Sequence, residues 1–220
     1  MSNSRIREEY VRRVFAKKVI YMCEFIKVIR KGFVELSEEE KNSTQRIEEI
    51  ANEILIYFQQ ASYPIDIQHI ALKTGFDIYQ GPIQNPEESA KLIIDETLDV
   101  IINNGKYIGD KIIIVNDKDT VYHQNFAIAH VLGKYIFEYP DNDYPYYCSY
   151  ITNTDYSDAE ARANRFAAAL LMPKDIFETQ YDFLKKNNGT IYDIYNKLSD
   201  MFCVSPEAVR RRFPELNIKV

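Results

Sequence analysis

Hydrophobic residues recur at helical spacing in the N-terminal part of the chain. Over residues 5–31 an apolar residue returns every four or seven positions, which predicts one long helix that Gly32 ends. The segment 37–45 (SEEEKNSTQ) contains no apolar residue and predicts a linker or a helix start, so we place a boundary near residue 44. A second apolar stripe predicts a helix over 46–60.

The middle of the chain changes to short β-type runs. The turn at Tyr63–Asp66 predicts a short helix that has Pro64 in its first position and stops at Gly75. Beyond it, runs of aliphatic residues with Asn and Gly turns between them predict a small sheet of three or four strands. These runs lie at 76–79, 92–94, 100–102 and 112–115.

The remainder of the chain returns to helical spacing. Helices are predicted at 122–137, 157–172, 191–202 and 205–213. A Pro- and Tyr-rich segment at 139–156 predicts a loop after the first of them. The order of elements therefore predicts a mostly helical α+β protein.

Composition and cysteine usage narrow the class of protein. Hydrophobic residues make up 46% of the 220 residues and charged residues 27%, which is typical of a globular domain. No apolar run is long enough to span a membrane, and residues 1–30 lack the pattern of a signal peptide. Cys23, Cys148 and Cys203 lie far apart, which excludes a disulfide framework and a CxxC metal site. We therefore expect a cytoplasmic protein without membrane contact.

Charge is distributed unevenly along the chain. Residues 1–31 hold nine Lys or Arg and three Glu, a net charge of +6, which leaves −12 for the rest of a chain whose total is −6. A basic segment on an otherwise acidic protein is suited to bind nucleic acid, an acidic partner or the acidic part of the same chain. It is equally typical of a helix surface exposed to solvent.

Two segments carry the candidate chemistry. A helix with the pattern His-Glu-x-x-His places two imidazoles one turn apart to bind zinc, and its Glu accepts a proton from the metal-bound water. Here residues 126–136 read FAIAHVLGKYI and residues 160–173 read EARANRFAAALLMP. The first resembles the Phe-Thr-Ile-Ala-His-Glu-Leu-Gly-His-Tyr pattern of the ImmA/IrrE metallopeptidase family. The second is similar to that family's Glu-x-x-Ala-Asn-x-Phe-Ala segment, which ends in Leu-Leu-Met-Pro.

This resemblance, over roughly residues 46–213, implies a zincin-like fold and a zinc site. It implies a peptidase-like domain at 45–185, preceded by a basic helical extension at 1–44 and followed by a helical tail at 186–220. By position, His130 matches the first zinc ligand and Glu160 the third. Lys134 stands where the second His is expected, and Val131 stands where the general base is expected.

Both departures act against peptidase chemistry. Val131 has no atom that accepts a proton, and the ammonium of Lys134 has no lone pair for a metal. We expect that Lys134 takes the place of zinc by pairing with Glu160, while His130 hydrogen-bonds nearby. The alternatives are that Lys134 points into solvent, that Lys134 loses its proton and binds the metal, or that a loop carboxylate replaces the lost ligand.

Four other side chains come into question as replacement ligands. His123 lies about 10.5 Å from His130 along a helix, and Glu138 lies even farther, which disfavours both. Asp141 and Asp158 lie on or beside the predicted loop and remain candidates.

Three functions follow from these residues. The first is a catalytically impaired protein without zinc that binds a helix-turn-helix repressor or another partner of a mobile element or stress response, as the resemblance implies. The second is a zinc-dependent metallo-endopeptidase with non-standard ligands, which cleaves a repressor. The third is a DNA-binding regulator, because residues 198–209 resemble part of a helix-turn-helix unit and Arg210, Arg211 and Arg212 follow.

Overall fold

The computed structural model describes residues 24–95, 99–102, 105–140, 145–152, 157–187 and 189–219, with the backbone alone for 99–102 and 105–108. Most of the predicted N-terminal basic helix, together with Asp141, lies outside the described residues. Within them, no helix is both long and apolar enough to cross a membrane.

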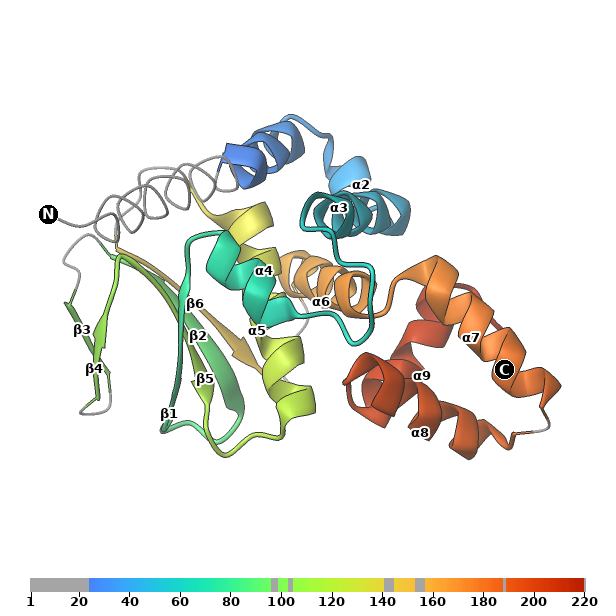
Figure 1. The fold of residues 1–220 in the computed structure, drawn as a ribbon. Helices are drawn as coiled ribbons and strands as arrows, with labels where there is room; N and C mark the ends of the chain where they lie inside the picture. Colours follow the sequence, from blue (N-terminus) through green and yellow to red (C-terminus); the bar gives the residue numbers. More distant parts are fainter. Residues whose placement is uncertain are drawn as a thin grey trace, which may run out of the picture.

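The described chain begins and ends with helices, and its strands lie in between, as Figure 1 shows. It begins with helical residues 24–34. The labelled helices are α2 (Glu38–Lys41), α3 (Thr44–Tyr57), α4 (Ile67–Lys73), α5 (Val121–Glu138), α6 (Asp158–Leu171), α7 (Lys174–Lys186), α8 (Ile191–Phe202) and α9 (Pro206–Glu215). The strands are β1 (Asp77–Gly81), β2 (Glu88–Ile94), β3 (Asp99–Ile102), β4 (Gly105–Ile108), β5 (Lys111–Asn116) and β6 (Tyr146–Ile151). These elements confirm the predicted α+β class.

The main sheet has four strands in the order β1-β5-β2-β6, and β3 and β4 pair separately as a hairpin. β1 runs parallel to β5, whereas β2 runs antiparallel to both β5 and β6. The prediction of a loop over the whole of 139–156 was wrong, because β6 lies within it. Tyr146–Ile151 are rich in aromatic residues that suit a strand, and β2 supplies hydrogen-bonding partners that no local pattern shows.

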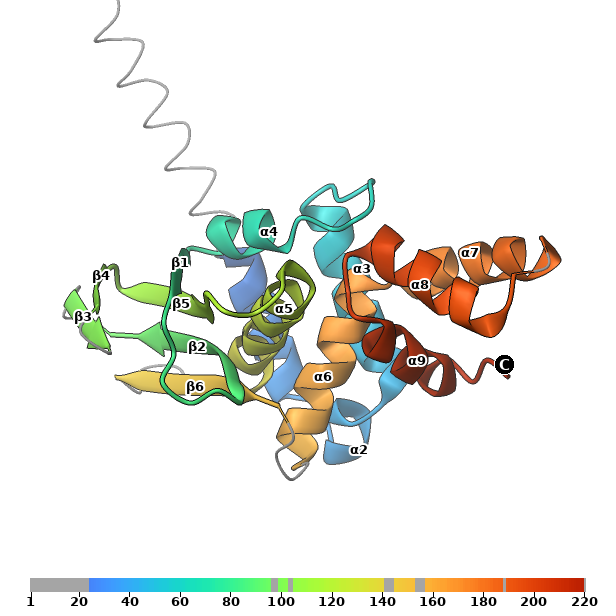
Figure 2. The same ribbon diagram turned by 90° about the horizontal axis from the view of Figure 1, so that it is seen from below.

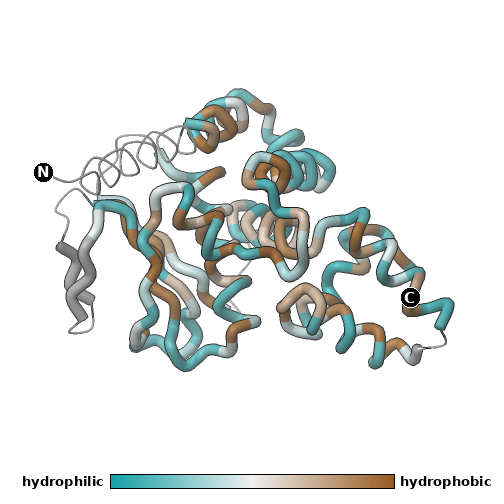
Figure 3. The backbone as a smooth tube through the Cα atoms, viewed as in Figure 1, coloured by the Kyte–Doolittle hydropathy of each residue, from teal (hydrophilic) through white to brown (hydrophobic). Residues whose placement is uncertain are grey.

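α5 is the central helix of the structure. One side of it faces the sheet and the other faces α6, as Figure 2 shows. Eleven of its 18 residues are buried, among them the run from Ala127 to Gly133. Figure 3 shows hydrophobic residues along the strands and inner helices, and hydrophilic residues along the outer turns. α5 and α6 therefore place their side chains in the interior, where the candidate site lies.

The described part of the N-terminal extension packs into this same core. The helix at 24–34 continues past Gly32, so the predicted stop was wrong; the Phe33 ring is buried 4.4 Å from the Phe137 ring centroid, and this burial outweighs the low helix propensity of glycine. Arg30 is also buried and donates a hydrogen bond to the Tyr139 carbonyl oxygen (2.6 Å). The division at residue 44 stays a prediction.

A second boundary differs from its prediction at α4. This helix begins at Ile67 after the N-cap Asp66, whose carboxylate accepts a hydrogen bond from the His69 backbone N–H (2.9 Å). Pro64 lies before the cap in a cis peptide bond, so the prediction that it occupies the first helical position was wrong. The side-chain cap, and not the proline, sets where this helix starts.

The C-terminal helices α7, α8 and α9 lie together at one end of the structure (Figure 1). They pack through an aromatic cluster. Phe177 of α7 lies 5.9 Å from Phe202 of α8 and 5.1 Å from Phe213 of α9, between ring centroids. Ser205 caps α9 and Pro206 occupies its first turn, in agreement with the predicted helices at 191–202 and 205–213.

Candidate functional site

Two helices hold the candidate residues at close range. Gly133 of α5 faces Phe166 and Ala163 of α6, and a Cβ on Gly133 would lie 2.9 Å from Phe166 Cδ1. Glycine and the alanines of α6 therefore let the two backbones approach more closely than larger side chains would allow. His130 and Lys134 lie four residues apart on α5, as Glu160 and Asn164 do on α6. Each pair thus shares one face of its helix.

His130 lies at the centre of the site and is fully buried. Its Nδ1 atom lies 2.9 Å from Asn164 Oδ1, and its Nε2 atom lies 3.0 Å from Glu160 Oε2. The second contact lacks hydrogen-bond alignment, so Nε2 is a buried polar atom without a hydrogen bond. The roles of the two ring nitrogens depend on the tautomer: a proton on Nδ1 faces the Asn164 amide oxygen, and a proton on Nε2 faces the Glu160 carboxylate.

Lys134 points inward and contacts Glu160. Its ammonium pairs with Glu160 Oε1 and donates a second hydrogen bond to the Ser149 carbonyl oxygen on β6 (3.3 Å). The predicted pairing of Lys134 with Glu160, beside His130, is therefore present. The alternative that Lys134 points into solvent was wrong, since its side chain is 15% exposed. One ammonium connects α5, α6 and β6.

Burial and the Lys134 ammonium affect the pKa values of both Glu160 and His130. Burial opposes the charge of Glu160, but the contacts with His130 and Lys134 outweigh it and lower the pKa of this carboxyl to about 2. Burial lowers the pKa of His130 and outweighs the nearby Glu160 carboxylate. At neutral pH the site therefore holds an ionised Glu160 beside a neutral imidazole.

Val131 occupies the position of the general base and is buried among core side chains. It offers no proton acceptor. Among the described residues, the contacts of His130 and Glu160 include no other carboxylate that could take its place.

The donor set does not fit a tetrahedral zinc site. Zinc takes four ligands, of which three are commonly protein side chains in catalytic sites. The His130 Nε2 lone pair suits a metal, and Glu160 is a suitable second ligand. Among the described residues, however, no three His, Cys, Asp or Glu side chains come together, and the ammonium of Lys134 has no lone pair.

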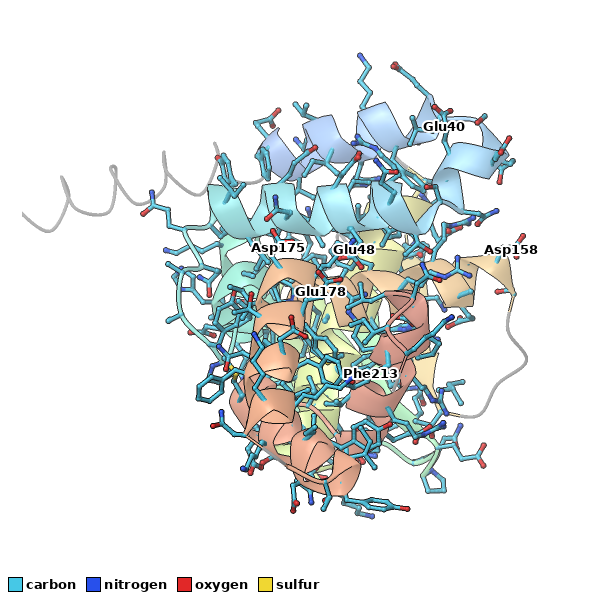
Figure 4. The ribbon with its side chains drawn as sticks, turned by 90° about the vertical axis from the view of Figure 1, so that its right-hand side faces the viewer. Glu40, Glu48, Asp158, Asp175, Glu178 and Phe213 are labelled. Atoms are coloured by element: carbon cyan, nitrogen blue, oxygen red, sulfur yellow. The ribbon has the colours of Figure 1, made fainter. Side chains whose placement is uncertain are left out.

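The other proposed ligands do not complete the set. The Glu138 carboxylate is bound by Arg162 at 2.6 Å. Asp158 is exposed in the first turn of α6, and Figure 4 shows it at the outer end of that helix. Asp141 lies outside the described residues.

A cleft of about 680 Å³ opens beside the site. Glu160 and Asn164 line it from α6, and the edge strand β6 contributes Tyr150 and Ile151. The first turns of α5 and the outer face of α9 complete its walls. The cleft is large enough for several residues of an extended peptide.

The three arginines of α9 differ in their surroundings. Arg212 is fully buried, lies 2.6 Å from Glu48 and donates a hydrogen bond to the Met172 carbonyl oxygen. The prediction that Arg212 contacts DNA was therefore wrong. Arg210 and Arg211 are exposed on the rim of the cleft, and both bind Glu207. The helix rotates by 100° per residue, which separates Arg212 from its neighbours.

The sequence matches the model of one protein family over more than half of its length. The sequence model of the IrrE N-terminal-like domain, a peptidase family, matches residues 93–213, which is more than half of the chain. The chain belongs to this family. A search of curated proteins finds no match.

The segment matched to the IrrE N-terminal-like family contains His130, Glu160 and all but the last two residues of α9. Asn164, which holds His130, and the Ser149 carbonyl, which holds Lys134, were not singled out from the sequence. Asn164 follows Glu160 by four residues, and this spacing could have identified it. No sequence signal indicates the Ser149 contact, because it depends on β6.

Proposed function

We propose that this protein binds a protein partner in the cleft beside His130 and does not cleave it. The observation that carries this proposal is the ammonium of Lys134 in contact with Glu160, at the place where the family resemblance implies a metal. The absence of a general base at Val131 supports it further, since losing such a base lowers rates by about 10²–10⁴-fold.

The cleft supports a binding function that does not require chemistry. It lies against β6, the edge strand of the main sheet, and an extended segment of a partner can add to such an edge through main-chain hydrogen bonds. By family resemblance, we propose a helix-turn-helix repressor or another regulatory protein of a mobile element or stress response as the partner. We propose the cytoplasm as its location.

Metal analysis of the purified protein tests the loss of chemistry. We expect no stoichiometric zinc at pH 7, and no hydrolysis of a partner after prolonged incubation. The restoring variant Val131→Glu with Lys134→His supplies the missing base and ligand, and we expect it to bind zinc. About one zinc per wild-type chain that disappears in His130→Ala, together with peptide hydrolysis, would contradict the proposal.

Partner capture from the native host tests the binding function. Ala161 lines the cleft, whereas Ala61 is exposed elsewhere. Ala161→Trp should therefore abolish co-purification of the partner, and Ala61→Trp should leave it intact. Equal capture by both variants would exclude the cleft as the binding site.

One observation favours a second candidate function, a metallo-endopeptidase with altered ligands. His130 Nε2 is buried without a hydrogen bond and lies 3.0 Å from a carboxylate oxygen, as two ligands of one ion would. This function requires Lys134 to leave Glu160 or lose its proton, so zinc affinity should rise steeply with pH. The metal analysis described above, repeated at pH 6 and pH 9, distinguishes the two candidate functions.

A further inference from the structure

A second hollow, of about 550 Å³, lies between α3 and the start of α7. Its lining includes Glu48 of α3 and residues 173–176, and we call it the α3–α7 groove. Figure 4 shows Glu48 and Asp175 on this side of the molecule. The adjacent residues Ala168 and Ala169 of α6 line the cleft and the groove respectively. Both hollows therefore border the same end of α6.

Arg212 connects the two hollows from within the protein, where it is fully buried. Its Nη1 atom lies 2.6 Å from Glu48, which lines the groove, and 3.4 Å from Glu215, which lines the cleft. Its Nε and Nη2 atoms donate hydrogen bonds to the Met172 carbonyl oxygen, at 3.2 and 3.0 Å. One guanidinium therefore binds a carboxylate from each hollow, and the end of α6 fixes the plane of that guanidinium.

Glu48 and Glu215 compete for this one cation. Burial raises the pKa of Glu215 and outweighs Arg212, which lowers it; the Glu48 carboxylate raises the pKa further, and Arg165 of the cleft lowers it. Two carboxylates beside a single buried guanidinium repel each other, so each keeps its charge more firmly when the other is neutral or withdrawn. The charge that Glu215 presents to the cleft therefore depends on the state of Glu48 in the groove.

From this geometry we infer that Arg212 couples the α3–α7 groove to the cleft. A cationic side chain of a partner that draws Glu48 away from Arg212 leaves the guanidinium to Glu215, which then keeps its negative charge at the cleft wall. The side chains of Glu48 and Glu215 are 18% and 25% exposed, so a ligand in either hollow can reach one of them. Such coupling is reciprocal, since a ligand at Glu215 changes the affinity at Glu48 by the same factor. The inference goes beyond the proposed function, because it assigns a regulatory role to a second surface.

Other contacts of α9 keep this helix in place while Arg212 changes partners. The Phe213 ring packs against Phe177 (5.1 Å between centroids) and Tyr181 (5.0 Å), and Val209 is buried. When Glu48 is withdrawn, Arg212 retains Glu215 and the Met172 carbonyl oxygen. We therefore expect a change at Glu48 to reach the cleft without unfolding the C-terminal helices.

An NMR titration of the side-chain carboxyl carbons in the full chain measures the pKa of Glu215 directly. The Glu215 signal is assigned from its loss in Glu215→Gln. Glu48→Gln removes the competing charge and keeps the shape of the side chain, so we expect the pKa of Glu215 to fall. Glu49→Gln is the matched control, because Glu49 lines the same groove but binds Arg46 (3.0 Å). This control should leave the pKa of Glu215 unchanged.

Urea unfolding of Glu48→Gln, Glu215→Gln and the double variant at pH 8 gives a second readout. Each single variant leaves Arg212 with one carboxylate, whereas the double variant leaves the buried guanidinium with the Met172 carbonyl oxygen. The double variant should therefore raise the unfolding equilibrium constant by about tenfold more than the product of the single effects, as residues that share a partner do. Glu49→Gln combined with Glu215→Gln should give the product alone.

An unchanged pKa of Glu215 in Glu48→Gln would overturn the inference, as would independent effects in the double variant or an equal response to Glu49→Gln. If Glu48→Gln does not fold, Glu48→Asp takes its place, because the shorter side chain withdraws the carboxylate from Arg212 and should also lower the pKa of Glu215. Neither experiment requires a partner. The zinc analysis and Ala161→Trp decide the proposed function separately, and Ala61→Trp remains a valid control there because it changes no charge.

Discussion

Replacing Lys134 with Met and Glu160 with Gln, singly and together, measures how strongly the pair stabilises the fold. The pKa of Glu160 falls from the ordinary 4.5 to about 2, and a shift of this size corresponds to about 3 kcal/mol of folding free energy. Glu160 is 20% exposed, and water at the cleft reduces the effect. His130 and Lys134 both contribute to this shift, so we expect a coupling energy of about 1–2 kcal/mol between Lys134 and Glu160.

Each single substitution should lower the free energy of unfolding by more than the coupling energy between the two residues. Lys134→Met leaves the Glu160 carboxylate without its cation, and Glu160→Gln leaves a partly buried ammonium with one carbonyl acceptor. Breaking a buried pair in this way costs about 3–5 kcal/mol, while the double variant removes both charges and should recover part of the loss. The pair would then act as a stabilising replacement for the metal bridge that the family resemblance implies.

Urea unfolding of the four proteins at several pH values provides the measurement. Because the folded-state pKa of Glu160 is depressed, the stabilisation is complete above about pH 4.5 and is lost as pH falls toward 2. The coupling should therefore be constant between pH 8 and pH 5 and smaller at pH 3.5. Lys27→Met with Glu24→Gln is a matched control, because that pair is more than half exposed and should couple by less than about 1 kcal/mol. Additive effects of Lys134→Met and Glu160→Gln at pH 7 would refute the reasoning.

Further substitutions separate buried contacts from exposed ones. Arg212→Met should lower the free energy of unfolding by about 3–5 kcal/mol, because it strands the carboxylates around a buried guanidinium, whereas the exposed Arg210→Met should change it by less than about 1 kcal/mol in the same urea titration. Gly133→Ala should lower the melting temperature through a loss of about 1–3 kcal/mol, since the new methyl group would lie 2.9 Å from Phe166. Gly32→Ala should raise it through a gain of about 0.5–1 kcal/mol, because the added Cβ meets nothing within 4 Å and the backbone there is helical.

The helices α3, α5, α6 and α8 could be predicted because their apolar residues recur at 3.6-residue spacing over three turns or more, whereas no helix was predicted at α7. The helix predicted at 122–137 corresponds to α5 (Val121–Glu138), and the one predicted at 157–172 corresponds to α6 (Asp158–Leu171). β6 could not be predicted in this way, since its residues alternate neither in hydropathy nor in burial and its pairing partner lies more than 50 positions earlier. Tertiary pairing decided its structure.

Arg212 shows a prediction that failed although the signal was present. Three successive arginines look equivalent in the sequence, and their position after the helix-turn-helix-like segment predicts that all three are surface cations. Val209 and Phe213 are buried, and Arg212 lies three residues after the first and next to the second, on the same face of α9. The apolar spacing of the helix therefore indicated an inward orientation, and Glu48 of α3 supplied the charge that no local pattern reveals.

At the candidate site, two closely packed helices hold side chains that differ from those of a zinc site. The close approach of α5 and α6 at Gly133 and the alanines of α6 holds positions 130, 134 and 160 within contact distance. With imidazoles at 130 and 134, such an arrangement would leave the carboxylate at 160 facing a metal. With Lys134 the same carboxylate meets an ammonium that is covalently part of the chain. Under the proposed function, the sequence itself supplies the positive charge at this point without a metal, and the cleft beside it serves to bind the partner.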